Sequence, residues 1–206
     1  MPTFDARYIQ IAKYDYDKET GKVSYTGKTK VGDAMEVNLE LKFAEGRLYA
    51  EGRLAEYMKL ATGGTISAAV KHILQEAQKM MYGTKDHART VGDKEVPGLR
   101  FSAKDIANYV GFSLYAPDKI DGVTKYTTMF VSKALFGPPS YSFKTKGQNL
   151  EFKTPTTTGE FLADDSTDEV LIDTATVDTI EEAKAWCDVV LGGAAAASAA
   201  NTEGEA

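Results

Sequence analysis

The segment from Tyr109 to Phe161 constrains the fold most, because it reads as three or four consecutive β-strands. In the first of them, Val110, Phe112 and Leu114 occupy alternate positions. That period of two is expected of a strand with one buried face. The strands are expected at Tyr109–Ala116, Tyr126–Phe136, Asn149–Thr154 and Thr156–Leu162.

The second of these strands, Tyr126–Phe136, is apolar on both faces. Strict alternation places Phe130 and Phe136 on one face, and the opposite face carries Met129, Val131 and Leu135. A strand that is apolar on both faces has to be covered on both faces. In one small domain the cover is a second layer or a neighbouring subunit, so the pattern raises the question of assembly before that of catalysis.

Composition narrows the classes of function. The chain has 206 residues and a formal net charge of −6, which argues against a general nucleic-acid binder, since such a protein needs a basic face. Cys187 is the single cysteine, so an intramolecular disulfide is excluded. No apolar run approaches the roughly 20 residues of a membrane span. Residues 1–14 carry charges throughout and do not resemble a signal peptide, so we expect folding in a cytoplasm.

The strongest alternation in the sequence lies at residues 35–43. Apolar side chains at odd positions alternate with polar ones at even positions, which predicts a strand with one buried and one hydrated face. The apolar set is Met35, Val37, Leu39, Leu41 and Phe43, and the polar set is Glu36, Asn38, Glu40 and Lys42. Residues 7–14 are expected to form an earlier strand, and residues 23–25 the returning arm of a hairpin.

The middle of the chain is harder to interpret. Residues 46–64 are expected to form a long loop that leaves the domain body, with either an extended stretch at 48–53 or a short helix at 54–61. An apolar period typical of a helix predicts one over residues 67–82, ended by Gly83. Residues 84–100 are expected to be a polar connection.

The C-terminal part is acidic and then helical. Thr179 and Glu182 have the spacing of a capping box, which predicts a helix with an apolar stripe on one side. The stripe consists of Ala183, Trp186, Cys187 and Val190. Residues 194–206 are a low-complexity tail rich in alanine.

The residues capable of catalysis or metal binding form no recognisable motif. His72 and His87 have no second ligand at metal-binding spacing, and Cys187 lies on an apolar helix stripe. The acidic run 163–169 could hold calcium, but it lacks the spacing of an EF-hand and is better interpreted as a solvated loop. We therefore expect no enzymatic activity, no metal and no cofactor. A set of aromatic residues could stack on bases or sugars, although core and subunit interface are favoured: Tyr109, Tyr115, Tyr126, Tyr141 and Phe143.

Three stretches carry a resemblance to a known family. They are Leu48–Glu51 followed by Gly63–Gly64; Gln75–Ala77 followed by Gly83; and the run from Tyr109 to Gly159, with its Phe143–Gly147 and Phe152–Gly159 motifs. In this order they resemble the major tail proteins, or tail tube proteins, of long non-contractile-tailed bacteriophages (siphophages), the type common in phages of Gram-positive bacteria. The resemblance covers roughly residues 35–162. The family's usual LYADD is LYAEG in this chain, which leaves the role of Glu51 open.

The resemblance implies a fold, an assembly and a set of partners. The fold would be mainly β (α+β): two packed antiparallel β-sheets, a tail-tube sandwich or barrel, with a flanking helix, a long inter-ring loop and a C-terminal helix. Residues 1–163 would form the tube domain and residues 164–193 an extension. Hexameric rings of this chain would stack into the tube of a virion. A tape measure protein, tail terminator and distal tail proteins would be partners, and DNA a transient passenger; no membrane would be involved.

The surfaces of such a tube can be assigned to residues of this chain. The polar side chains of the 35–43 strand are the candidates for lining the lumen: Glu36, Asn38, Glu40 and Lys42. The candidates for contacts between subunits are Leu48, Tyr49, Glu51, Arg53, Phe130 and Phe136. The alternatives are the tube of a contractile tail or related injection apparatus, a carbohydrate- or cell-binding β-sandwich at a tail tip, and an enzyme on a β-sandwich.

Overall fold

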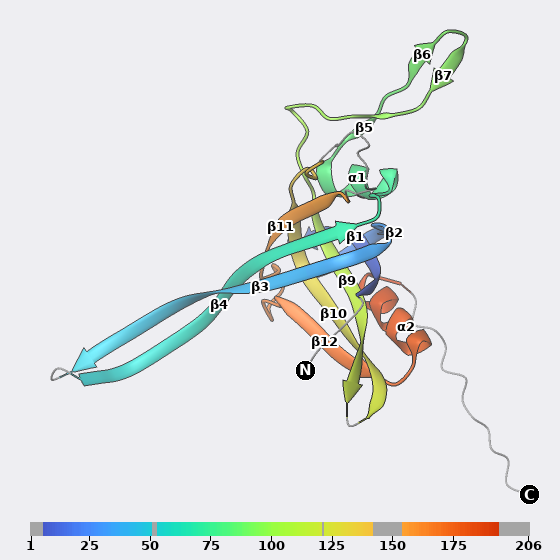
Figure 1. The fold of residues 1–206 in the computed structure, drawn as a ribbon. Helices are drawn as coiled ribbons and strands as arrows, with labels where there is room; N and C mark the ends of the chain where they lie inside the picture. Colours follow the sequence, from blue (N-terminus) through green and yellow to red (C-terminus); the bar gives the residue numbers. More distant parts are fainter. Residues whose placement is uncertain (1–5, 51–52, 121, 142–153, 194–206) are drawn as a thin grey trace, which may run out of the picture.

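The structure is a computed structural model that describes residues 6–50, 53–120, 122–141 and 154–193. Within these residues the chain is mainly β, with one large antiparallel sheet and two helices (Figure 1). The strands of the large sheet are β1 (Arg7–Asp17), β2 (Lys22–Lys30), β3 (Ala34–Ala50), β4 (Arg53–Val70), β9 (Tyr109–Ile120), β10 (Val123–Phe136), β11 (Thr156–Leu162) and β12 (Ile172–Val177). Their order is β2-β1-β9-β10-β11-β4-β3, and β12 pairs with β10 beside this path.

Two helices and two small ribbons complete the fold. The helices are α1 (Gln75–Tyr82) and α2 (Ile180–Val190). The ribbons pair β5 (Lys85–Asp86) with β8 (Leu99–Arg100), and β6 (Arg89–Val91) with β7 (Lys94–Val96). The expected hairpin of the first strands is confirmed as β1–β2, and the expected strands at 109–116, 126–136 and 156–162 are confirmed as β9, β10 and β11.

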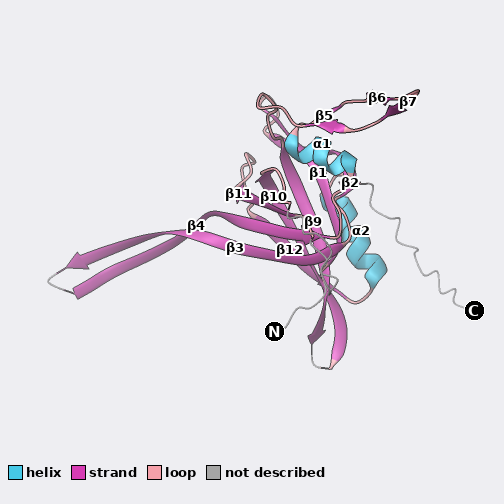
Figure 2. Cartoon of the chain, turned by 45° about the horizontal axis from the view of Figure 1, so that its top comes forward, coloured by secondary structure: helices cyan, strands magenta, loops and turns pink. Residues whose placement is uncertain are grey.

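The two apolar faces of β10 are both covered by this chain itself. On one face, Val131 and Phe136 join a core that contains residues of β1, β4, β9, β11 and α1. On the other face, Phe130 packs with Ala12 and Leu191, beside α2. Figure 2 shows α1 and α2 at different parts of the sheet. The second layer predicted for this strand is therefore present in the monomer, without a neighbouring subunit.

A β-bulge overturns the prediction that Phe130 and Phe136 share a face. The pairing of β10 with β9 shifts register between Val131 and Ala134, so the alternation changes phase there. As a result Phe130 faces α2, whereas Phe136 faces the main core, with its ring centroid 5.7 Å from that of Phe112. The extra residue is not visible in a strict period of two.

The predicted helix over 67–82 is wrong in its first half. Residues up to Val70 belong to β4, and α1 starts at Gln75. The side chains of Ile66, Ala68 and Val70 are at most 1% exposed, so the buried positions alternate as in a strand. The predicted end is confirmed: Gly83 adopts φ 67° and donates its N–H to the Lys79 carbonyl oxygen over 3.0 Å.

Three connections contain more strand than predicted. The expected loop 46–64 is the outer part of the β3–β4 hairpin, so the alternative helix at 54–61 is also wrong. The expected polar connection 84–100 contains β5 to β8, and the stretch between the acidic run 163–169 and α2 contains β12. The expected strand at 149–154 lies outside the described residues except for Thr154, which is in no strand.

The predicted capping box of α2 is confirmed. The Thr179 side chain accepts the N–H of Glu182, and the Glu182 carboxylate accepts the N–H of Thr179, at 3.2 and 3.1 Å. Ala183 and Cys187 of the predicted stripe are fully buried against the sheet. This start fixes α2 over β9 and β10, where it covers Phe130.

Candidate functional site: assembly surfaces

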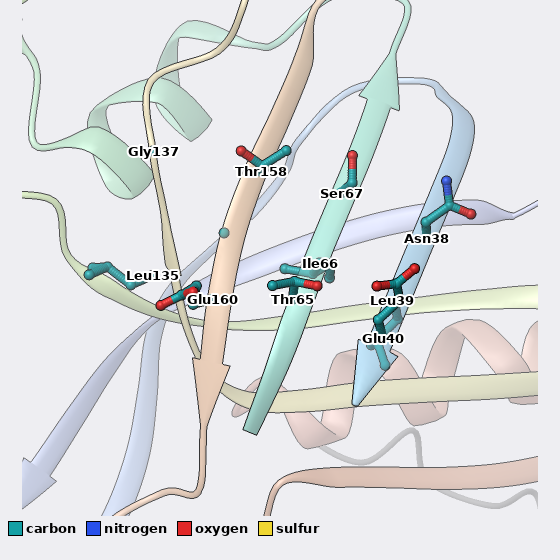
Figure 3. A pocket seen from close by; sticks show the side chains of 11 residues that line it. Asn38, Leu39, Glu40, Thr65, Ile66, Ser67, Leu135, Gly137, Thr158 and Glu160 are labelled. Atoms are coloured by element: carbon teal, nitrogen blue, oxygen red, sulfur yellow. The ribbon is translucent and has the colours of Figure 1, made fainter. Parts of the chain in front are cut away.

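A polar face extends over β3, β4 and β11. The register places Asn38, Ser67 and Thr158 in one cross-strand row, and Glu40, Thr65 and Glu160 in the next, so all six point to the same side. Figure 3 shows these side chains on three neighbouring strands. They line a shallow hollow of about 690 Å³. The four predicted lumen residues thus belong to a larger surface, and all four are exposed.

The polar face carries an excess of carboxylates. Glu36, Glu40 and Glu160 contribute negative charge, and Lys42, which lies just beyond the two rows, contributes a positive one. The Lys42 ammonium lies 2.7 Å from a Glu160 carboxylate oxygen, and this hydrogen bond and charge lower the pKa of Glu160. Such a surface binds water through hydroxyls and carboxylates and repels phosphate.

Sequence reasoning missed the contributions of β4 and β11 to the polar face. Thr158 and Glu160 are exposed and alternate with Thr157 and Phe161, which are 1% and 0% exposed. This alternation is visible in the sequence. The sequence does not show the strand order, which places β11 next to β4 and β4 next to β3.

The β3–β4 hairpin extends beyond the body as an arm, defined here as residues 43–50 and 53–61 (Figures 1 and 2). Its base is built on Gly63 and Gly64. Gly63 has φ 145°, and a Cβ on Gly64 would lie 2.2 Å from the Glu40 carbonyl oxygen and 2.3 Å from Phe161 Cζ. Glycine is therefore required at both positions, where β4 ends its pairing with β11 and continues into the arm.

The alternation of β3 reverses its polarity in the arm. In the body the even positions, such as Glu40, are polar. Beyond a register shift next to Lys42, the even positions of β3 become apolar, and Ala44 pairs with Leu60 and Gly46 with Met58. Leu48, Met58 and Leu60 are 57%, 61% and 59% exposed. We call Ala44, Leu48, Met58 and Leu60 the apolar arm face.

The opposite face of the arm is held together by charged and aromatic groups. The Lys59 ammonium lies 4.4 Å from the centroid of the Phe43 ring, and the Arg47 guanidinium carbon 5.6 Å from that of Tyr57. One carboxylate oxygen of Glu45 lies 3.4 Å from the Arg47 guanidinium, and the other lies 3.4 Å from the Lys59 ammonium. Hydrogen bonds from Tyr57 and then Lys59 lower the pKa of Glu45. These contacts order the ribbon without a core and leave the apolar arm face uncovered.

The predicted subunit contacts divide into two groups. Leu48, Tyr49 and Arg53 lie on the exposed arm, and Glu51 lies outside the described residues. Phe130 and Phe136 are 6% and 1% exposed, so the prediction that they contact another subunit is wrong. Their partners are inside the chain: the ring of Tyr25 lies edge-on to Phe130 at 5.3 Å, and Phe112 contacts Phe136.

The body also has an apolar groove of about 490 Å³ between β3 and the β9–β10 hairpin. Its apolar lining is Met35, Val37, Leu39, Leu114 and Met129. Met35 is 60% exposed, so the apolar side of β3 is only partly covered by the chain's own core. Among the described residues, β2, β3 and β12 each pair on one side only, which leaves three open sheet edges.

The candidates for chemistry are used for packing and loop structure. Cys187 is fully buried, and burial raises the pKa of its thiol to about 12. The Asp164 carboxylate accepts the N–H groups of Ser166 and Val170, both at 3.1 Å. A carboxylate oxygen of Asp165 accepts the Tyr14 hydroxyl at 2.7 Å and lies 2.5 Å from the Lys133 ammonium. The described residues contain no group of His, Cys, Asp and Glu that could hold a metal ion.

The aromatic set lies largely within the fold. Tyr115 is 4% exposed and packs edge-on against Tyr126 at 6.1 Å, and the ring of Tyr109 lies 6.5 Å from that of Tyr14. Tyr141 is 52% exposed, and Phe143 lies outside the described residues. These rings do not form one exposed stacking surface within the part of the chain that the structure describes.

Two comparisons with known proteins leave the chain without an assigned family. Neither a scan against protein-family models nor a search of curated proteins finds a match. No helix of the described residues is long and apolar enough to cross a membrane. The function is therefore inferred from the fold and its surfaces.

Proposed function

We propose that the protein is the structural subunit of a phage tail tube, in which hexameric rings of this chain stack into a hollow conduit for DNA. The observation that carries the proposal is the apolar arm face. On this projecting ribbon Leu48, Met58 and Leu60 are each more than half exposed. A monomer has no reason to keep such an apolar surface in contact with water. The arm extends away from the body (Figure 2), and no arm residue lines the apolar groove.

The open edges of the sheet support a ring. An exposed edge strand is a liability in a monomer and a pairing surface in an assembly. The strands at the two ends of the sheet order, β2 and β3, differ in sequence, so joining one to the other between copies is a head-to-tail contact. Contacts of this kind close into a ring when the rotation between copies allows it. The two halves of the curved sheet would then act as the two layers of a sandwich.

The polar face supports a lumen through which DNA passes. Glu36 and Glu40 of β3 and Glu160 of β11 stand on one exposed face, with β4 between the two strands. A wall with net negative charge repels phosphate and lets DNA slide, whereas a basic wall would retain it. The role is structural, with no cofactor, and the proposed partners are further copies, a tape measure protein, and tail terminator and distal tail proteins of the virion.

The proposal is tested by electron microscopy of the purified full chain over a series of concentrations. We expect rings or hollow tubes, and in a reconstruction of the tubes we expect Glu36, Glu40 and Glu160 to face the channel. A chain that stays monomeric at every concentration, also when a tail initiator complex is added, contradicts the tube. Tubes that carry these three side chains on the exterior contradict the lumen assignment alone.

A further inference from the structure

Residues 85–101 form a second projection, here called the tongue, that the proposed function does not use. It consists of the β5–β8 and β6–β7 ribbons, and β6 and β7 pair only with each other among the described strands. It lies beyond α1, on the opposite side of the body from β12 (Figures 1 and 2). Val91 and Val96 are 65% and 49% exposed.

One side of the tongue combines apolar and cationic groups. Arg89, Val96 and Arg100 line a hollow of about 510 Å³, together with His87, Val91 and Phe101. Arg89 pairs with Val96 across the ribbon, so both point to the same side. Within the described residues, neither arginine forms an ion pair with a carboxylate. The tongue thus presents two unpaired guanidinium groups beside exposed apolar side chains.

His87 adds to this arrangement. Its Nε2 lies 2.5 Å from an Nη atom of Arg100. Desolvation, and then the charges of Arg100 and Arg89, lower the pKa of His87. Because a guanidinium group can only donate, Nε2 of His87 is the acceptor in this contact with Arg100. This contact orients the guanidinium without neutralising it.

The complementary charge lies at the other side of the same molecule. Residues 164–188 contain nine carboxylates and one basic side chain, Lys184. Several of the carboxylates are engaged within the chain, as at Asp164 and Asp165. Asp168, Glu169 and Asp173 are exposed and make no side-chain hydrogen bond or ion pair with the described residues. Leu162 next to this loop is 46% exposed, which provides an apolar neighbour. We call Asp168, Glu169, Asp173 and Leu162 the acidic patch.

We propose that the tongue of one copy docks on the acidic patch of another copy, and that this contact joins copies head to tail. The contact rests on the proposed function, since it is one of the contacts within the tube. The occupant is a second copy because the acidic patch matches the tongue in both charge and apolar character, and because α1 separates the tongue from the body of its own molecule (Figure 1). A heterologous contact of this kind lets assembly grow along one direction where the rotation between copies does not close a ring.

A charge-swap experiment on the full chain tests the contact by sedimentation velocity in low and high salt. One variant reverses the tongue (Arg89→Glu with Arg100→Glu), and the second reverses the patch (Asp168→Lys with Asp173→Lys). We expect each variant alone to associate at least about tenfold more weakly than the wild type in low salt, because attraction becomes repulsion. An equimolar mixture of the two should recover association, since each reversed surface then finds an opposite charge.

The controls separate charge effects from misfolding. The variant Lys71→Glu with Lys119→Glu makes the same change in net charge as the tongue variant, at exposed positions outside both surfaces and outside the edge strands β2 and β3, and should associate like the wild type. Circular dichroism should be unchanged in all variants, because the reversed side chains lie outside the core.

The possible outcomes distinguish the two proposals. If the wild type forms tubes and the variants associate normally, the tongue contact is overturned and the tube proposal is retained. The same holds if the wild type forms tubes and the mixture of the two variants stays dissociated. A tongue variant that associates normally and loses only affinity for duplex DNA overturns it in favour of a phosphate-binding tongue. A wild type that never associates overturns the tube subunit and the contact together.

Discussion

Two parts of a single strand, β3, behave in opposite ways. At residues 35–42 the odd positions are apolar, and Val37 and Leu39 pack against the chain's own core. At residues 44–48 the apolar side chains, Ala44 and Leu48, are at even positions and stay exposed, while Glu45 and Arg47 occupy the odd ones. The body segment is stabilised by burial, whereas the arm segment is stabilised by pairing, ion pairs and cation–π contacts. A reversal of alternation within one strand therefore marks where a chain stops covering itself and offers a surface to others.

The largest expected effect comes from opening the core of the body. Phe161 is fully buried under Gly64, so Phe161→Ala should lower the free energy of unfolding by about 3–5 kcal/mol. Urea denaturation followed by tryptophan fluorescence measures this loss. Leu60→Ala in the arm is the control and should shift the midpoint very little. Equal losses at the two positions would show that the arm packs on a core after all.

A smaller effect is expected where polar contacts hold the acidic loop to the body. Asp165 accepts a hydrogen bond from Tyr14 and pairs with Lys133, and the hydrogen bonds from Lys133 and then Tyr14 lower the pKa of Asp165. The Asp165 side chain is 43% exposed, so solvent screening limits the cost of Asp165→Asn to about 1 kcal/mol at pH 7.

The sign of the pKa shift gives this prediction a pH dependence. A carboxylate with a lowered folded-state pKa stabilises the fold above its unfolded pKa, near 3.8, and loses that contribution as the pH falls through the folded value. Urea denaturation at pH 7 and at pH 3 should therefore show a wild-type advantage that is smaller at pH 3. An advantage of equal size at both pH values would mean that the charge of Asp165 contributes nothing.

The smallest effect on stability is expected in the apolar arm face. Met58→Ser with Leu60→Ser should change the free energy of unfolding by less than about 0.5 kcal/mol, because both side chains are more than half exposed and border no core. Thermal unfolding of dilute protein, where association is negligible, measures this. A loss above about 1.5 kcal/mol would place the arm within the cooperative body.

Several elements could be predicted because their signal is local. The alternation at residues 35–43 and the capping box at Thr179 each specify their element from neighbouring residues. The helix predicted from residue 67 failed because Val70 fits both a strand and a helix period, and only the pairing of β4 with β3 and β11 decides between them. At residues 67–70 the secondary structure was therefore determined by pairing with strands that are distant in the sequence.

The candidate surfaces also divide into features that local sequence predicts and features that depend on long-range strand pairing. Glu36 and Glu40 could be placed on a hydrated face, since exposure follows from alternation alone. Thr158 and Glu160 could not be joined to them without the strand order. Phe130 was assigned to a subunit contact because neither the bulge in β10 nor the position of α2 over the sheet can be read from a period of two.

The central claim is that the apolar arm face exists to contact another copy. The direct measurement is electron microscopy, with sedimentation velocity, of the wild type beside a variant with Leu48→Ser, Met58→Ser and Leu60→Ser. We predict rings or tubes for the wild type and folded monomers for the variant at the same concentration, because the substitutions remove apolar contact area and leave the body intact. A variant that forms the same tubes as the wild type would contradict the claim.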